Sequence, residues 1–303
     1  MIHKAKKSLG QNFLKSEPAL KKIIEVGEIK PDDVILEIGP GKGALTRKLL
    51  EKSGTVIAVE KDRELFELLK IKFEKEILEK KLILINEDIL EFEVSEEVSK
   101  FLSGPRFSGS LSQPDHAKNL KHLRYKVIAN IPYNITGAIL KKFLTDKNQP
   151  PLMVLMVQHE VAKRIMASDK KESILSISVK AYGEPKMIMK VPARYFSPSP
   201  KVDSAVILIQ NISRRNFNSP LEEYPLGGGG NASTPSRKRA TPQEGNKFEE
   251  RFWEIVKTRF AHKRKKLSGN LKTLKNTEIT LDLELGNKRA EDLTLEDWLL
   301  LAK

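Results

Sequence analysis

The chain of 303 residues contains no cysteine. Disulfides, thiolate zinc sites, cysteine-bound iron–sulfur clusters and cysteine nucleophiles are therefore excluded. Its five histidines are scattered without an HExxH pattern, so a zinc hydrolase has no support and no metal site is expected. The longest aliphatic run, LMVLMV, is far shorter than the roughly 18 to 20 apolar residues of a membrane span. The basic N-terminus lacks the apolar core of a signal peptide, so we expect a cytoplasmic protein that does not bind a membrane.

Positive charge is in clear excess. Lys and Arg number 54 against 40 Asp and Glu, which gives a formal net charge of +14. Such a balance is typical of proteins that bind a polyanion such as nucleic acid. Charge alone leaves a second interpretation open, that of a soluble, charge-rich protein without such a partner.

The pattern of apolar runs predicts an α/β fold. The first three runs are continuous, as in parallel strands buried on both faces, and helix-like segments with apolar positions three and four apart separate them. The segment between the last two runs is too rich in proline to form a crossover helix, so that pair is predicted to be antiparallel. We therefore expect a Rossmann-like, seven-stranded, mostly parallel sheet that ends in one antiparallel edge, as in many methyltransferases. The runs are 33–39, 55–60, 81–89, 125–131, 152–158, 185–191 and 204–210.

Composition divides the chain into three parts. Residues 1–212 hold all the strand signals and are predicted to form the catalytic domain, with 103–122 as a surface loop. Residues 213–246 include four consecutive glycines and are predicted to be a flexible insert or linker. Residues 247–303 have helical patterns and no strand signal, so we expect a small all-helical C-terminal domain.

Three motifs at the ends of the first three runs indicate a nucleotide-like cofactor. EIGPGKGALT places Gly39, Gly41 and Gly43 before a helix, where backbone can approach a ligand closely. Glu60 ends the second run, where its carboxylate can accept hydrogen bonds from ribose hydroxyls. The third run ends in NEDIL and places Asp88 at the next position along the carboxyl edge, where it can accept from an adenine amino group. These features fit NAD and S-adenosylmethionine equally, and a ligand-free turn and a helix cap remain alternatives.

The NIPY motif after the fourth run favours chemistry on an exocyclic amine. The amine of an aromatic base is a poor nucleophile because its lone pair is delocalised into the ring. Acceptors on both amino hydrogens, here the Asn130 side-chain oxygen and the Ile131 carbonyl, would hold the nitrogen nearer to tetrahedral. Pro132 would fix the turn and Tyr133 would stack on a base that has left its helix. The alternative is an Asn-Pro turn with a core tyrosine.

Two further segments indicate a function only in combination with these motifs. Phe196 lies in the proline-stiffened loop before the last run, where its ring would stack on the other face of the base or pack in the core. KTRFAHKRKK is either a phosphate-binding run or a solvated helix face. Its basic residues are Lys257, Arg259, Lys263, Arg264, Lys265 and Lys266.

Taken together, the chain resembles the ribosomal RNA adenine dimethyltransferase family of the small-subunit type. The resemblance spans residues 8–210 and is carried by SLGQNFL, EIGPGKGALT, VIAVEKD, NEDIL, NIPYNIT and VPARYFSPSPKVDSAV, in the family's order. NIPYNIT and FSPSPKVDSAV are highly specific in combination, whereas the glycine loop adds little by itself.

The resemblance implies an enzyme that transfers methyl groups from S-adenosylmethionine to N6 of two adjacent adenosines, in a hairpin near the 3′ end of small-subunit rRNA. It further implies a monomer that acts on an immature small ribosomal subunit. Asn12, Leu14, Gly39, Gly41, Glu60, Asp88 and Asn130 would bind the cofactor, Tyr133 and Phe196 would bracket the target base, and the helical C-terminal domain would bind RNA.

Three alternatives remain at this stage. The sister enzyme that methylates large-subunit rRNA shares the glycine loop and the NIPY motif. A non-catalytic nucleic-acid binder could have the same fold, and a nicotinamide dehydrogenase could use the same glycine loop. The fuller VPARYFSPSPKVDSAV stretch favours the small-subunit enzyme over its sister.

Overall fold

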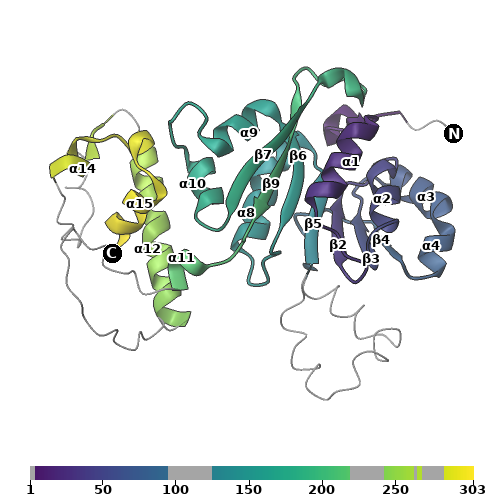
Figure 1. Ribbon diagram of the computed structural model, residues 1–303, viewed down its shortest axis with the longest axis horizontal. Coiled ribbons are helices and arrows are strands. Elements are labelled where there is room, and N and C mark those ends of the chain that lie inside the picture. Colours follow the sequence, from purple (N-terminus) through teal and green to yellow (C-terminus); the bar gives the residue numbers. More distant parts are fainter. Residues whose placement is uncertain (1–3, 95–124, 219–241, 263–264, 268–282) are drawn as a thin grey trace, which may run out of the picture. The chain divides into compact units, whose positions relative to one another are not determined.

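The computed structural model describes residues 4–94, 125–218, 242–262, 265–267 and 283–303. These residues form two compact units (Figure 1). The first comprises residues 1–166 and 183–212, and the second comprises 167–182 and 213–303. The second unit therefore includes a segment, 167–182, that lies inside the domain expected at 1–212. The loop expected at 103–122 and most of the insert expected at 213–246 fall outside the described residues.

The first unit is built on a seven-stranded sheet, as expected from the apolar runs. Its order is β4-β3-β2-β5-β6-β9-β7 (Figure 1). Pairing is parallel from β4 through to β6, whereas β9 is antiparallel to both β6 and β7. The strands are β2 (Val34–Ile38), β3 (Thr55–Val59), β4 (Leu82–Ile85), β5 (Tyr125–Asn130), β6 (Met153–Gln158), β7 (Glu184–Val191) and β9 (Ser204–Gln210).

Two details of the predicted sheet are wrong. The antiparallel strand is not at the edge, because β9 enters between β6 and β7 and leaves β7 outermost. Burial explains this order: β9 is apolar between Ser204 and Gln210 and buried along nearly its whole length, while β7 carries exposed lysines suited to an edge. The third strand ends at Ile85, so Asp88 lies in the turn after β4 and not in the strand.

Helices of the first unit pack on this sheet. In α1 (Glu17–Val26), the apolar side buries Ala19, Leu20 and Ile23, and the helix contacts β6 and β9. Helices α2 (Ala44–Leu50), α3 (Arg63–Lys72) and α4 (Glu74–Leu78) contact β3 or β4, and α8 (Thr136–Thr145) follows β5. Helix α9 (His159–Met166) contacts β6, β7 and β9.

A second, two-stranded sheet joins segments far apart in sequence. Strand β1 (Phe13–Leu14) pairs antiparallel with β8 (Phe196–Ser197), and the backbone nitrogen of Lys15 donates to the Tyr195 oxygen at 2.8 Å. The apolar patterns did not predict these strands because each has only two residues. This pairing brings SLGQNFL against the loop that carries Phe196.

The second unit is helical. It contains α10 (Ile174–Lys180), α11 (Arg215–Asn218), α12 (Pro242–Phe260), α14 (Leu283–Asn287) and α15 (Leu295–Ala302). The ring of Tyr182 stacks on Trp253 at 6.2 Å, and its hydroxyl donates to Glu249, which also pairs with Arg214. These contacts explain why residues 167–182 belong to this unit. Helix α12 begins at Pro242, inside the expected insert.

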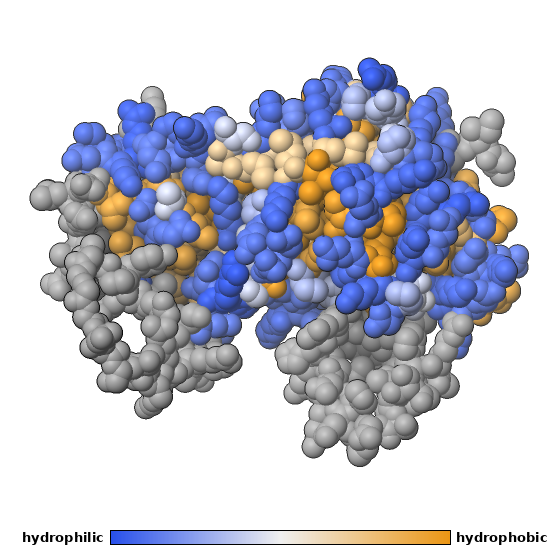
Figure 2. Space-filling model, in the orientation of Figure 1, coloured by the Kyte–Doolittle hydropathy of each residue, from blue (hydrophilic) through white to orange (hydrophobic). Residues whose placement is uncertain are grey.

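Hydrophilic side chains cover most of the visible face of the first unit, with apolar groups exposed between them (Figure 2). Exposed apolar side chains include Ile71 in α3 and Leu78 in α4. Within the part of the chain that the structure describes, no helix is both long enough and apolar enough to cross a membrane.

Candidate active site

A cavity of about 560 Å³ opens where β2, β3 and β5 end. Carboxyl ends of parallel strands are where doubly wound sheets bind ligands, and the volume is that of a small-molecule pocket. Every cofactor residue predicted from the sequence lines it, together with the NIPY motif. Those lining residues are Asn12, Leu14, Gly39, Gly41, Glu60, Asp88, Asn130, Ile131, Pro132 and Tyr133.

The glycine loop between β2 and α2 requires glycine for two reasons. Gly41 and Gly43 have φ of +60° and +75°, a left-handed conformation that other residues adopt at a cost. A Cβ on Gly41 would lie 3.0 Å from the ring of Phe13, and one on Gly43 would lie 2.5 Å from Phe73. These two positions therefore have no room for side chains, and at Gly41 bare backbone faces the cavity.

Glu60 is held as a fixed acceptor directly after β3. Its side chain is buried, and its two carboxylate oxygens accept from the backbone N–H groups of Gly41 at 3.0 Å and Asp62 at 2.9 Å. Each carboxylate oxygen can accept more than one hydrogen bond. The site thus presents an oriented carboxylate at the place where the sequence predicted ribose recognition.

Glu37 also lines the cavity, and the sequence reasoning missed it. It lies in β2 with 1% of its surface exposed. Burial raises the pKa of this carboxyl to about 8, and the nearby Glu60 charge adds to the effect. An acidic residue within the apolar run VILEI was the available signal.

Asp88 is engaged on both sides. Its Oδ2 accepts from the Lys61 ammonium at 2.6 Å, and its Oδ1 accepts from the Leu90 N–H at 3.0 Å. The hydrogen bond from Lys61 holds the pKa of Asp88 below its usual value. Asp88 is thus an ionised acceptor at the cavity wall, and it also caps the turn that follows β4.

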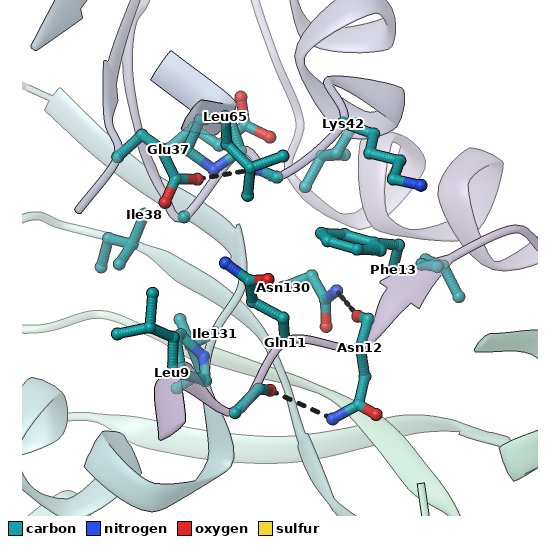
Figure 3. A pocket seen from close by; sticks show the side chains of 18 of the residues that line it. Leu9, Gln11, Asn12, Phe13, Glu37, Ile38, Lys42, Leu65, Asn130 and Ile131 are labelled. Atoms are coloured by element: carbon teal, nitrogen blue, oxygen red, sulfur yellow. Dashed lines mark hydrogen bonds between the residues drawn. The ribbon is translucent and has the colours of Figure 1, made fainter. Parts of the chain in front are cut away.

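Asn130 at the end of β5 is oriented by the N-terminal segment, residues 6–14. Its side-chain nitrogen donates to the backbone oxygen of Asn12 at 3.2 Å, and the Asn12 side chain donates to Gly10 at 3.1 Å (Figure 3). A flipped amide would set its oxygen against the Asn12 carbonyl, so the geometry fixes Nδ2 there. The other amide atom, Oδ1, remains to accept from a ligand.

The rest of the NIPY motif turns the chain into α8. Pro132 has φ −60°, and the Thr136 hydroxyl donates to the Tyr133 carbonyl oxygen at 3.1 Å. The Tyr133 hydroxyl is hydrogen-bonded to the hydroxyl of the buried Ser204 in β9, and burial raises the pKa of the phenol. Tyr133 is therefore a neutral, anchored ring at the cavity wall.

Phe196 is not on the cavity wall. Only 2% of it is exposed, and it belongs to the hydrophobic cluster that includes Leu14, Val191 and Val206. In this conformation the ring is a core side chain, and it would have to leave the cluster to stack on a base. The neighbouring residue, Tyr195, has an exposed ring: it is 39% exposed, and the Arg194 guanidinium lies 5.2 Å from the ring centroid.

The N-terminal segment covers one side of the cavity. Gln11, Asn12 and Phe13 all line it, and the Lys42 ammonium lies 4.9 Å from the Phe13 ring centroid (Figure 3). Leu14 is also a cavity residue, although it is 6% exposed and belongs to the core cluster.

The predicted RNA-binding run is only partly described. Lys257, Lys265 and Lys266 are exposed, whereas Lys263 and Arg264 lie outside the described residues. Arg259 is 2% exposed, and no described residue contacts its guanidinium by a hydrogen bond. Arg259 is thus buried in this conformation, and its assignment as a phosphate-binding residue stays a prediction.

Fold and site together define the class: a Rossmann-like α/β protein with a small-molecule cavity at the carboxyl ends of its parallel strands and a helical C-terminal region. Residues 2–224 match the protein family described as "Ribosomal RNA adenine dimethylase". The chain belongs to this family.

Curated relatives carry the name ribosomal RNA small subunit methyltransferase A. That of Dehalococcoides mccartyi (strain CBDB1) is 40% identical over 206 residues, which are 68% of this chain and 62% of that protein. The match thus spans less than two thirds of that relative. That of Francisella tularensis (strain SCHU S4 / Schu 4) is 34% identical over 305 residues, covering 99% of this chain and 97% of that protein.

Two solved structures share the fold. The 23S rRNA methyltransferase ErmE is 23% identical with a TM-score of 0.64, covering 96% of this chain and 98% of that one. A dimethyladenosine transferase from Plasmodium falciparum is 22% identical with a TM-score of 0.66, covering 95% of each chain. At these identities the likeness supports the fold alone.

Proposed function

We propose that this protein transfers methyl groups from S-adenosylmethionine to N6 of two adjacent adenosines in a hairpin near the 3′ end of small-subunit rRNA, two methyls on each. The substrate class follows from the family and from relatives named for the small subunit. The protein acts as a cytoplasmic monomer on an immature small subunit.

One observation carries the chemical part of the proposal, the fixed amide of Asn130. Because its nitrogen is bound to the Asn12 carbonyl, its oxygen is the atom that can accept from an amino group. The Ile131 carbonyl follows it in the chain and would accept the second amino hydrogen. The two acceptors would hold the amine nitrogen nearer to tetrahedral, with its lone pair directed at the methyl donor. No strong general base is required.

The residues that remain fit the proposed cofactor. Its adenosine would place the ribose hydroxyls on Glu60 and the adenine amino group on Asp88, while the glycine loop accommodates the methionine part. When bound, S-adenosylmethionine supplies the electrophilic methyl group. The acidic Glu60 also argues against NADP, whose 2′-phosphate it would repel. Burial of Glu37 keeps that carboxyl largely protonated at neutral pH, so it adds little negative charge to the wall.

Tyr133 would hold the target base and the second unit would hold the surrounding RNA. The anchored Tyr133 ring offers a stacking surface beside Asn130, and base stacking on aromatic rings is worth about 1 to 3 kcal/mol. The exposed ammonium groups of Lys257, Lys265 and Lys266 would contact phosphates in a salt-dependent manner.

The test is to incubate the purified protein with labelled S-adenosylmethionine and either unmethylated small subunits or large-subunit rRNA, and then to map modified adenosines. Paired dimethyladenosines near the 3′ end of the small-subunit RNA are expected. Methylation of large-subunit RNA alone would replace the proposal with the sister activity. Tight RNA binding without any transfer would favour a non-catalytic binder.

A further inference from the structure

Asp62 lies beside the cavity without lining it. It is hydrogen-bonded both to the N-terminal segment and to residues that follow β3. Its side chain is fully buried. Oδ1 accepts from the Lys6 ammonium at 2.7 Å and from the Glu64 N–H at 3.0 Å, while Oδ2 accepts from the Gln11 side-chain nitrogen at 2.7 Å. Its own N–H donates to Glu60 Oε1 at 2.9 Å.

These contacts connect the N-terminal segment to the proposed ribose acceptor. On the N-terminal side, the Lys6 N–H donates to Gln11 Oε1 at 2.8 Å, so Lys6 and Gln11 bind each other as well as Asp62. On the other side, Asp62 binds Glu60, which in turn accepts from Gly41 of the glycine loop. One carboxylate thus joins the segment to the loop after β3.

Charge makes this connection strong. Asp62 and Glu60 are both buried carboxylates only two positions apart, and a buried charge is costly unless it is paired and hydrogen-bonded. The Lys6 ammonium supplies positive charge at this corner, and its hydrogen bond to Asp62 raises the pKa of Lys6. Loss of Lys6 would remove this positive charge, and its hydrogen bond to Asp62, from beside the two carboxylates.

A helix cap alone does not account for the arrangement. Asp62 is the N-cap of α3, but that role uses one oxygen and one hydrogen bond, from the Glu64 N–H. Serine or asparagine performs it about as well. The bonds to Lys6 and Gln11 contribute nothing to the cap.

We propose that Asp62 is a positioning residue: through Lys6 and Gln11 it holds the N-terminal segment against the cofactor cavity, and through its N–H it orients Glu60. Cofactor affinity then depends on Lys6, a residue that does not line the cavity. This inference rests on the proposed function, because it takes S-adenosylmethionine as the ligand and Glu60 as its ribose acceptor.

The test compares Lys6→Met and Asp62→Asn with wild type and with a control, Glu64→Gln. Glu64 also contacts Lys6, at 3.0 Å, but its side chain is 64% exposed, so its contribution is screened by water. Calorimetry without RNA measures the Kd of S-adenosylhomocysteine, and limited trypsin digestion measures cleavage after Lys7. Thermal unfolding without ligand measures stability.

Lys6→Met and Asp62→Asn are expected to weaken binding about tenfold and to speed cleavage after Lys7, with melting temperatures near wild type. Glu64→Gln is expected to stay within twofold in Kd. Absence of binding by wild type would overturn the proposed function itself. Binding by wild type with unchanged Kd in Lys6→Met would overturn only the positioning role. Equal losses in Glu64→Gln would also overturn it, because they would show a general effect of surface charge.

Discussion

The side-chain nitrogen of Asn130 donates to the backbone oxygen of Asn12, 118 positions away in sequence, at 3.2 Å. The residue at the centre of the proposed chemistry is therefore oriented by a main-chain atom of the N-terminal segment. Because that segment is also bound to Asp62, the amide orientation and the cavity wall depend on the same piece of chain.

Replacing Asn130 by Ala or Asp should slow transfer by about two to three orders of magnitude. Alanine removes the acceptor, and aspartate sets a carboxylate against the Asn12 carbonyl. Loss of one such polar contact in a transition state costs about 10²- to 10³-fold in kcat. Single-turnover methyl transfer measures the effect, and fluorescence anisotropy with a small-subunit hairpin RNA serves as control, with RNA affinity expected near that of wild type. Full activity in Asn130→Ala would remove the amine-holding role.

Phe196 has two candidate roles, as a core side chain and as a ring that stacks on the target base. Replacing it by a small or by a larger apolar side chain separates them. Phe196→Ala should destabilise the protein by about 3 to 5 kcal/mol, as for other buried phenylalanines, whereas Phe196→Leu should cost less than about 1.5 kcal/mol. If the ring leaves the core to stack on the base, Phe196→Leu should still lower kcat/KM roughly tenfold.

The matched control for that experiment is Phe143→Leu. Phe143 is 1% exposed and packs against Tyr125 in the core of the same unit. Urea unfolding and transfer kinetics are measured on both leucine variants. Activity of Phe196→Leu equal to that of Phe143→Leu would assign Phe196 to the core alone.

Much of the first unit could be predicted from the sequence, because parallel strands buried on both faces give continuous apolar runs. Six of the seven strands begin and end within one residue of the predicted runs, whereas β4 ends four residues before the end of its run, and Glu60 and Asn130 take the predicted places at strand ends. The position of β9 was not predictable in this way, since an apolar run does not specify its neighbours.

What the sequence did not predict depends on contacts between distant segments. The β1 and β8 pair joins residues about 180 positions apart and is too short for a periodic pattern. The buried state of Phe196 and Arg259 depends on packing that no local pattern encodes. The role of Asp62 was not predicted, because its bonds to Lys6 and Gln11 form only when the N-terminal segment folds back.

Glu37 predicts a specific pH dependence of stability. Its pKa is about 8 when folded, above the ordinary value near 4.5, so the folded state favours the protonated form. The stability that this group contributes is fully present below about pH 4.5 and is lost as pH rises towards 8. Glu37→Gln removes this titration. The free energy of unfolding of the variant, relative to that of wild type, should therefore be higher at pH 8.5 than at pH 5 by on the order of 2 to 4 kcal/mol. Urea midpoints at both pH values measure it, and an equal difference at both would contradict the buried, protonated state.

The exposed lysines of the second unit predict how RNA affinity varies with salt. Changing Lys257, Lys265 and Lys266 together to Gln removes three positive charges from exposed positions. Each phosphate contact contributes about 0.7 to 0.9 to the slope of log K against log salt, so the slope should fall by roughly 2 to 3. Fluorescence anisotropy with a small-subunit hairpin RNA at several salt concentrations measures both affinity and slope.

The control removes the same charge from the first unit, by changing the exposed Lys52, Lys70 and Lys75 to Gln. Net charge falls by three in both variants, so any difference between them reports local contacts and not the overall field of a +14 protein. A smaller slope only in the second-unit variant is the expected result. Equal slopes in both variants would show that the loss of RNA affinity depends only on net charge. The phosphate contacts would then lie elsewhere than at Lys257, Lys265 and Lys266.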